Sequence, residues 1–253
     1  MADGRLAIDP HAGLGRLWTA GVPPAFFVKM RARRPRSNKD DTVADELNLP
    51  DGAFDRLDES SDEDFYEPAR LVYHIDDHAV AVLTDFYRTV LPAGGTVFDL
   101  MSSWVSHLPP DVEYGEVIGH GMNEEELAAN PRLTRHFTQN LNANQTLPLA
   151  DNSLDAATIC VSIQYLQHPV AVMRDLARVL RPGAPLVISF SNRCFWTKAV
   201  AVWRASSPSG HIALVRRYLD AAGFTDIETH RLAEYIEDRQ DPMTAVVGHV
   251  PPV

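Results

Sequence analysis

Residues 155–190 contain a strand, a helix and a second strand, and this order restricts the fold more than any other feature of the chain. Residues 155–161 form a continuous apolar stretch, which is typical of a strand buried on both faces. Pro169 begins a helix with a wide apolar stripe, and Pro182-Gly183 stops it before another apolar stretch. A strand, a helix and a strand in this order predict parallel neighbouring strands, so we expect an α/β fold.

The same alternation begins near residue 66 and continues to residue 250. We expect a helix over residues 77–91, capped by Asp76 or Asp77, and a short helix that Asn123 and Glu126 open as a capping box. A last helix is expected over residues 211–222. The other strands are expected over residues 96–100, 116–120, 137–141, 226–231 and 244–250. The prediction is a mostly parallel seven-stranded sheet that ends in an antiparallel hairpin.

Residues 1–64 differ from the rest, because they hold breakers and an acidic run instead of periodic segments. We therefore expect an N-terminal extension or arm over residues 1–64 and a folded domain over residues 65–253. The extension is too apolar for a solvated tail, so part of it should pack on the main body or on a partner subunit. A packed arm is favoured over a lid above a ligand pocket. The apolar residues concerned are Leu17, Trp18, Val22, Phe26, Phe27 and Val28.

Charge and composition exclude several classes of function. The net charge of −11 would repel a phosphate backbone, which argues against nucleic acid as a partner. No stretch approaches the roughly 20 apolar residues that span a bilayer, and the N-terminus lacks a basic start, so a cytoplasmic protein without a membrane partner is expected. Cys160 and Cys194 cannot make a disulfide framework and are expected as free thiols.

Three stretches, residues 97–109, 117–127 and 147–192, resemble the class I S-adenosylmethionine (SAM)-dependent methyltransferases, especially their type 11 branch. Residues 147–192, LPLADNSLDAATICVSIQYLQHPVAVMRDLARVLRPGAPLVISFSN, resemble that family from the loop before its fourth strand to its fifth strand. Residues 97–109 resemble its SAM-binding turn, and residues 117–127 its ribose-binding turn. The resemblance covers about residues 66–250. It implies a Rossmann-like fold, SAM as cofactor and a ligand at the carboxyl ends of the strands.

The turn that should hold the methionine end of SAM departs from the family. In DLMSSWV, Asp99 matches the family's carboxylate, but Met101, Ser103 and Val105 stand at its three glycine positions. Glycine serves there through positive φ and the lack of a side chain, so we expect a remodelled turn. Ser102 and Ser103 should donate hydroxyl and backbone N–H groups to the cofactor.

The adenosine side departs as well. Gly121 stands where the family has an acidic residue that holds the ribose hydroxyls, and Asn123 is the nearest substitute, although it also fits a helix cap. Met122 is expected on the adenine face. The adenine edge is expected to meet Asn140, Leu141 and Asn142.

The substrate side is expected at the ends of the fourth and fifth strands. By resemblance, the backbone of Val161 and Ser162 approaches the sulfonium. The residues expected to contact the substrate or its covering are Gln164, Tyr165, Asn192, Arg193, His107 as a general base, Tyr66, Arg70 and His74. Each also has a structural alternative, as a cap, a core aromatic or a surface charge. His74 and His78 would share a helical face, but no third ligand is evident, so no metal is predicted.

The leading hypothesis is a methyltransferase that moves the SAM methyl group to oxygen, nitrogen or sulfur of a small molecule, with a homodimer formed through the extension. A methyltransferase-like domain that binds a ligand or partner without methyl transfer is the alternative, because the glycines are missing. A third is another reaction on the same fold.

Overall fold

The computed structural model describes residues 47–252, so the apolar residues of the extension named above lie outside the described part. Seven strands of that part form one sheet in the order β3-β2-β1-β4-β5-β7-β6. They are β1 (Thr96–Leu100), β2 (Glu116–Gly121), β3 (Arg135–Thr138), β4 (Ala156–Cys160), β5 (Pro185–Phe190), β6 (Thr225–Ala233) and β7 (Met243–His249). β1 to β5 pair in parallel, and β7 is antiparallel to both β5 and β6. The predicted fold class is confirmed.

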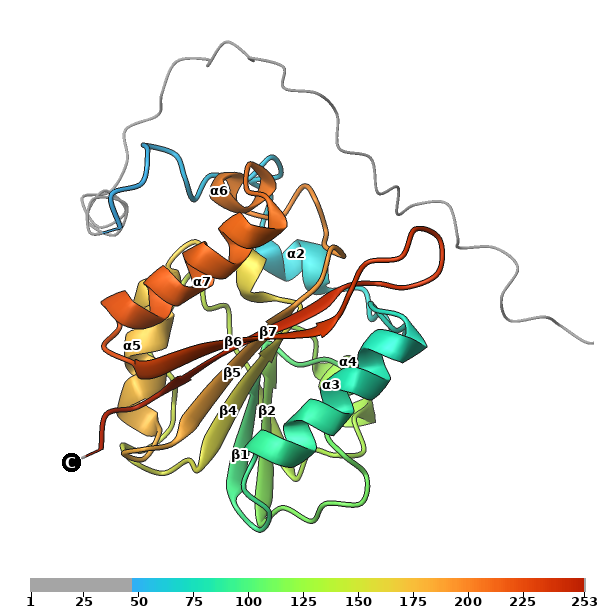
Figure 1. Ribbon diagram of the computed structural model, residues 1–253, viewed down its shortest axis with the longest axis vertical. Coiled ribbons are helices and arrows are strands. Elements are labelled where there is room, and N and C mark those ends of the chain that lie inside the picture. Colours follow the sequence, from blue (N-terminus) through green and yellow to red (C-terminus); the bar gives the residue numbers. More distant parts are fainter. Residues whose placement is uncertain (1–46, 253) are drawn as a thin grey trace, which may run out of the picture. The chain divides into compact units, whose positions relative to one another are not determined.

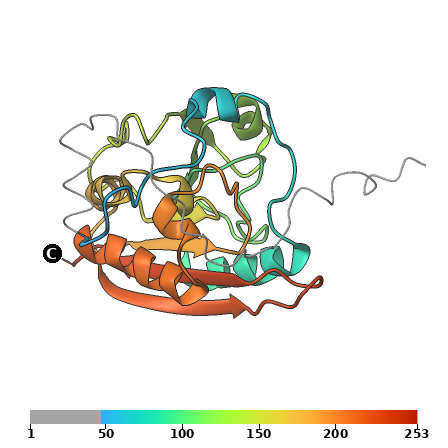
Figure 2. The ribbon, with the colours of Figure 1, turned by 90° about the horizontal axis from the view of Figure 1, so that it is seen from above.

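Helices cover both faces of this sheet (Figure 1). They are α2 (Asp62–Tyr66), α3 (Asp77–Val90), α4 (Glu124–Ala129), the 3-10 helix η1 (Ile163–Tyr165), α5 (Pro169–Val179), α6 (Ala201–Arg204) and α7 (Pro208–Ala221). Figure 2 shows α2 next to α4, and the two are joined where the Asn123 amide donates to the Tyr66 carbonyl (3.0 Å). This contact places the segment before α3 at the carboxyl ends of β1 and β2.

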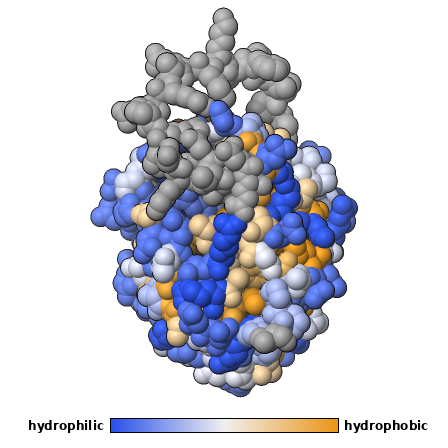
Figure 3. Space-filling view, turned by 90° about the vertical axis from the view of Figure 1, so that its left-hand side faces the viewer, coloured by the Kyte–Doolittle hydropathy of each residue, from blue (hydrophilic) through white to orange (hydrophobic). Residues whose placement is uncertain are grey.

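Successive strand residues serve two separate hydrophobic cores. Phe98 and Leu100 of β1 belong to the core under α5 and α7, whereas Val97 belongs to the core under α3. Such alternation is required of a central strand with helices on both faces. Hydrophilic side chains surround smaller hydrophobic areas on the outer face seen in Figure 3. None of the helices within residues 47–252 is long and apolar enough to cross a membrane.

Several boundaries differ from the sequence prediction. β3 begins at Arg135 and ends at Thr138, two to three residues before the predicted strand, because pairing with β2 stops at Gly121 and the chain then turns. α7 begins at Pro208, since Ser207 caps it. α2, η1 and α6 were not predicted. His74 precedes the cap of α3, so it does not share a helical face with His78.

The start of α3 is tied to the β6–β7 hairpin by two carboxylates. Asp76 caps α3 by accepting from the Ala79 N–H (2.7 Å) and also accepts from the Asp241 N–H (2.6 Å). The buried Asp241 carboxylate in turn accepts a hydrogen bond from the Asp76 N–H (3.2 Å). Asp76 therefore joins two elements that are far apart in the chain.

Replacing Asp76 tests this tie. We expect Asp76→Ala to lower the free energy of unfolding by about 1–3 kcal/mol, because it removes a helix cap and leaves a buried N–H without its acceptor. Asp77→Ala, which removes an exposed neighbouring carboxylate, should cost less than about 1 kcal/mol. Urea unfolding of both variants measures the difference, and equal losses would contradict the assignment.

Candidate functional site

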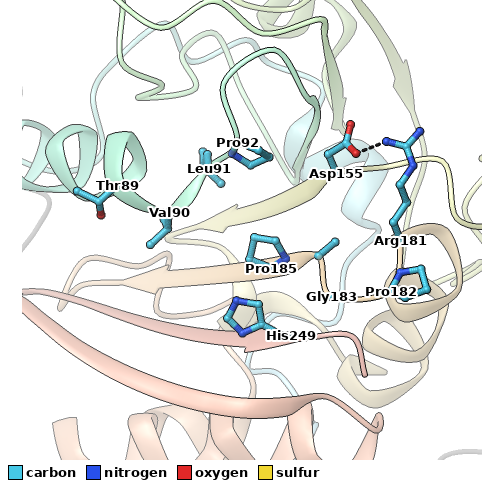
Figure 4. A pocket seen from close by; sticks show the side chains of 11 residues that line it. Thr89, Val90, Leu91, Pro92, Asp155, Arg181, Pro182, Gly183, Pro185 and His249 are labelled. Atoms are coloured by element: carbon cyan, nitrogen blue, oxygen red, sulfur yellow. Dashed lines mark hydrogen bonds and ion pairs between the residues drawn. The ribbon is translucent and has the colours of Figure 1, made fainter. Parts of the chain in front are cut away.

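An open depression of about 490 Å³ lies at the amino edge of the parallel strands (Figure 4). Its lining includes Pro185 at the start of β5 and His249 at the end of β7. Its Asp155 carboxylate pairs with Arg181 and accepts from the Thr96 N–H, so these polar groups join β1, β4 and the turn before β5. Ligands of doubly wound sheets bind at the opposite edge. We therefore assign the depression a structural role and place the candidate site at the carboxyl edge.

Asp99 lies buried at the carboxyl end of β1. One carboxylate oxygen accepts from Thr158 Oγ1 (3.0 Å), and the other accepts from Ser102 Oγ (2.6 Å). Burial raises the pKa of Asp99 to about 6, against the opposing effect of its hydroxyl donors. In this structure the carboxylate connects β1, β4 and the turn between β1 and β2.

The turn keeps a glycine-like backbone without the glycine. Met101 has φ 57°, in the left-handed region that favours glycine. Its N–H donates to His120 Nδ1 (3.2 Å), and the next N–H, of Ser102, donates to the His120 carbonyl (2.6 Å). These bonds hold the turn against the end of β2.

The same contact explains the glycine at the end of β2. A Cβ atom on Gly121 would lie 2.6 Å from the backbone oxygen of Ser102. Cβ atoms in proteins essentially never lie so close to another non-bonded atom. An acidic side chain at residue 121 would therefore displace the turn. The glycine is required by the turn, and the adenosine side must find its polar groups elsewhere.

Two buried polar atoms without hydrogen-bond partners lie at the exit of β4. They are Ser162 Oγ and Gln164 Oε1, whereas the Gln164 amide nitrogen donates to the Val161 carbonyl (2.8 Å). Val161 has φ 49°, so the chain turns sharply after β4. A buried acceptor and a buried hydroxyl without partners are unusual in proteins. They suit the end of a ligand that carries both donors and acceptors.

The segment of residues 61–73, named the strap below, contacts the asparagines that are expected to lie on the adenosine side of the site. Its acidic side chains accept from two asparagines after β3: Glu63 from Asn140 (2.7 Å) and Asp62 from Asn142 (2.9 Å). Its backbone carbonyls at Tyr66 and Glu67 accept from the Asn123 amide (3.0 and 2.8 Å).

The expected adenosine contacts are thus engaged by the strap. Asn123 also caps α4 by accepting from the Glu126 N–H (2.9 Å), which uses its remaining polar atom. Leu141 is buried and Met122 is half-buried beside these residues in the chain. Bonds of 2.7–3.0 Å leave no room for a ligand atom between the strap and the asparagines.

A buried lysine anchors the start of the strap. Lys198 Nζ donates to the Ser60 carbonyl (2.7 Å) and lies 3.5 Å from Asp62 and 3.6 Å from Asp58. Asp62 also pairs with Arg56 (2.5 Å). Sequence reasoning missed this cluster, although a lysine within the apolar run KAVAVW was a signal.

Aromatic rings enclose the Arg70 side chain on the strap. The guanidinium lies 4.8 Å from the Phe65 ring centre and 5.5 Å from that of Phe195, and it donates to the Phe65 carbonyl. His74 packs edge-on against Phe195 (5.7 Å), and burial lowers the pKa of His74. Tyr165 accepts from the Phe195 N–H through its hydroxyl (2.8 Å). Arg70, His74 and Tyr165 are therefore brought together around Phe195.

The remaining predicted substrate residues are spread more widely. His107 stacks beside Tyr73 (6.2 Å), and burial, aided by nearby His74, lowers the pKa of His107 to about 4. Arg193 donates to the buried Asp241 (2.8 Å), and Asn192 is exposed. Their catalytic roles stay predictions.

The residues present fit SAM in part. The β4 exit offers unpartnered polar atoms, and the β1 turn keeps the backbone conformation that its glycine motif would have. Ser103 donates to the Glu126 carboxylate (2.8 Å), which places a carboxylate beside the turn. The adenosine side fits only after the strap moves, because its asparagines are engaged. The residues at the β1 turn and the β4 exit therefore fit the methionine end of SAM, whereas the strap occupies the asparagines expected to contact adenosine.

Part of the chain matches a known protein family. Residues 102–188 match the type 11 methyltransferase family model, described as a methyltransferase domain. A ubiquinone/menaquinone biosynthesis C-methyltransferase from Rubrivivax gelatinosus is 29% identical over 123 residues, 39% of this chain and 49% of that protein. A demethylmenaquinone methyltransferase from a Mycobacterium species is 38% identical over 94 residues, 30% of this chain and 41% of that protein. The chain spans less than half the length of these relatives.

Solved structures share the fold. A SAM-dependent methyltransferase from Archaeoglobus fulgidus superposes with a TM-score of 0.52 at 12% identity, over 67% of this chain and 94% of that one. The cyclase SpnF superposes with a TM-score of 0.52 at 15% identity, over 74% of this chain and 90% of that one. At these identities the likeness establishes the fold alone.

Acid titration tests the role of His120 at the turn. Its pKa is lowered by burial to about 4 from 6.5, so between these values the unfolded chain binds a proton that the folded chain does not. The free energy of unfolding should therefore fall as the pH falls from 6.5 to 4, by up to about 3 kcal/mol from this residue. Asp99, with its raised pKa, acts in the opposite direction but is common to all variants.

Urea unfolding of wild type and His120→Gln at about pH 7, 6 and 5 isolates this contribution. The variant should lose stability at neutral pH, and its deficit should shrink as the pH falls. His78→Gln, an exposed control, should keep the wild-type pH dependence. A constant deficit for His120→Gln would show that His120 does not resist protonation.

Proposed function

We propose that this chain, whose residues 102–188 match the type 11 methyltransferase family, is a class I SAM-dependent methyltransferase that binds SAM at the carboxyl edge of its sheet and methylates a small molecule. When bound, SAM supplies an activated methyl group. The protein then has to align the acceptor with that group and exclude water. We assign the cofactor's methionine end to the β1 turn and the β4 exit.

The observation that carries the proposal is the extent of the family match. It begins at Ser102 in the β1 turn and ends at Ile188 in β5, so it includes the turn from Ser102 onward, the end of β2, the end of β3 and the exit of β4. These are the elements that meet at the carboxyl edge. Ser102 and Ser103 would offer hydroxyl and N–H donors, and Ser162 and Gln164 would offer their unpartnered atoms.

The chemistry of the side chains restricts the acceptor. A pKa of about 4 makes His107 a weak base at neutral pH, and burial raises the pKa of Tyr165 well above its ordinary value, so its phenol stays protonated. Neither side chain is therefore suited to take a proton from a weakly acidic acceptor. We infer an acceptor that is already nucleophilic, such as an amine, a thiolate or an electron-rich carbon.

The names of the relatives add carbon to the expected acceptor atoms. The Rubrivivax protein is a C-methyltransferase, and a Brevibacillus brevis protein that is 36% identical over 83 residues, 28% of this chain and 30% of that protein, is a malonyl-acyl-carrier-protein O-methyltransferase. The two names differ in acceptor atom. We therefore extend the oxygen, nitrogen and sulfur acceptors expected from the sequence to include carbon, with oxygen limited to acceptors that are already ionised, such as a carboxylate. The cytoplasmic location and the homodimer through the extension stay predictions.

A second candidate function is a ligand-binding domain that does not transfer methyl groups. The observation that favours it is the engagement of Asn123, Asn140 and Asn142 by the strap. If those bonds are permanent, the adenosine side is unavailable. Binding of S-adenosylhomocysteine separates the two candidates.

Calorimetric titration with S-adenosylhomocysteine is the experiment. We expect one molecule bound per chain by the wild type. Glu63→Ala should bind about three- to tenfold more tightly, since it removes one strap bond that binding has to break. Glu67→Ala makes the same charge change on the strap and should bind like the wild type, because only its backbone carbonyl bonds Asn123.

Absence of binding by the wild type and by Glu63→Ala would reject the proposal in favour of the second candidate. Binding followed by transfer of labelled methyl from SAM to amine, thiol or activated-carbon acceptors would support it. Equal affinity of wild type and Glu63→Ala would leave the function in place and reject the obstruction by Glu63.

A further inference from the structure

We propose that Glu126 is the acidic residue of the cofactor site and that it binds the ribose hydroxyls of SAM in place of its present partners on the turn and the strap. This inference rests on the proposed function. It assigns a role to a residue that the sequence pattern explained only as half of a capping box.

The Glu126 side chain does not complete that capping box. In a capping box the carboxylate returns to the N–H of the cap residue. Here Asn123 supplies its half of the box, whereas the Glu126 carboxylate bonds residues outside α4. Its orientation therefore needs another explanation than the start of the helix.

The Glu126 carboxylate lies between the β1 turn and the strap. One oxygen accepts from Ser103 Oγ in the β1 turn (2.8 Å), and the other accepts from the Arg70 N–H in the strap (2.6 Å). Both partners are neutral donors, one a hydroxyl. Two vicinal ribose hydroxyls are donors of the same kind, and a carboxylate accepts from both with bonds stronger than a neutral acceptor makes.

The end of β2, where the family usually has its ribose-binding acid, has no space for a side chain. Gly121 at the end of β2 cannot carry a side chain without displacing the Ser102 backbone. Doubly wound nucleotide-binding folds place their ribose-binding acid about 20 residues after the first turn. Glu126 follows Ser103 by 23 residues and already contacts it. The acid has thus moved from the strand end onto α4.

The exchange also connects cofactor binding to the strap. When the Glu126 carboxylate accepts from ribose, its hydrogen bond from the Arg70 N–H is broken. That hydrogen bond is one of those that hold the strap over the adenosine side. Binding of the ligand therefore removes one hydrogen bond that holds the strap in place. The strap and the ribose compete for one carboxylate.

Glu126→Gln tests the assignment, because it keeps the size of the side chain and removes its charge. We expect affinity for S-adenosylhomocysteine to fall by about tenfold, the effect of replacing a charged acceptor by a neutral one. Glu125→Gln makes the same change on an exposed residue of α4 and should bind like the wild type. Thermal unfolding of the ligand-free variants checks that both are folded.

The 2′-deoxy analogue of S-adenosylhomocysteine distinguishes contact from a structural effect. It should bind wild type more weakly than the parent compound, and Glu126→Gln should lose little further affinity for it, because the hydroxyl concerned is absent. An undiminished loss of about tenfold with the analogue would overturn the ribose contact. Unchanged affinity of Glu126→Gln for the parent would overturn the inference but leave the proposed function intact, whereas absence of binding by wild type would reject the function itself.

Discussion

The contact between the β1 turn and His120 is the interaction on which the arrangement of the carboxyl edge depends. Two consecutive N–H groups, of Met101 and Ser102, donate to the ring and the carbonyl of His120. They hold Met101 in a left-handed conformation that costs a non-glycine residue about 1–2 kcal/mol. The turn then lies so close to β2 that only glycine fits at residue 121. The position of the turn against β2 is therefore connected with the glycine at residue 121.

The strap is the second constraint on function, because it makes binding depend on an opening step. Its start is anchored by Lys198, Asp62 and Arg56, a buried set of charges in which removal of one partner leaves the others unpaired. Its middle is held by neutral and charge-assisted hydrogen bonds to the adenosine side. A ligand that binds only the open form has its apparent affinity reduced by the fraction of chains that are open. This explains how one sequence combines an ordinary methyltransferase sheet with an adenosine side whose polar groups are already engaged.

The sequence predicted the sheet well, because each strand is a short apolar stretch between breakers and because the order of elements determines which strands are parallel. β3 was displaced because residues 137–141 mix one buried leucine with turn residues, and periodicity cannot separate them. The positions of Asp99 and Gly121 at the carboxyl edge were predicted, because both residues stand at strand ends. The partners of Asn140 and Asn142 were not, since the strap reaches them from residues almost 80 positions away and no local pattern reports such a contact.

Glu126 shows why a local motif can mislead about function. The pair Asn123 and Glu126 fits a helix start, and the structure uses Asn123 in that way, but the glutamate bonds donors from two distant segments. Whether the Glu126 side chain caps its own helix or bonds distant segments depends on its tertiary neighbours. Those neighbours are set by the turn on His120 and by the path of the strap.

Hydrogen exchange at the Arg70 amide, with and without saturating S-adenosylhomocysteine, tests the central claim most directly. That amide donates to the Glu126 carboxylate in the structure, and the ribose hydroxyls are expected to replace it there. We expect its exchange to become faster on binding while the amides of Met101 and Ser102, held by His120, stay protected. Unchanged or slower exchange at Arg70 in the saturated protein would contradict the account.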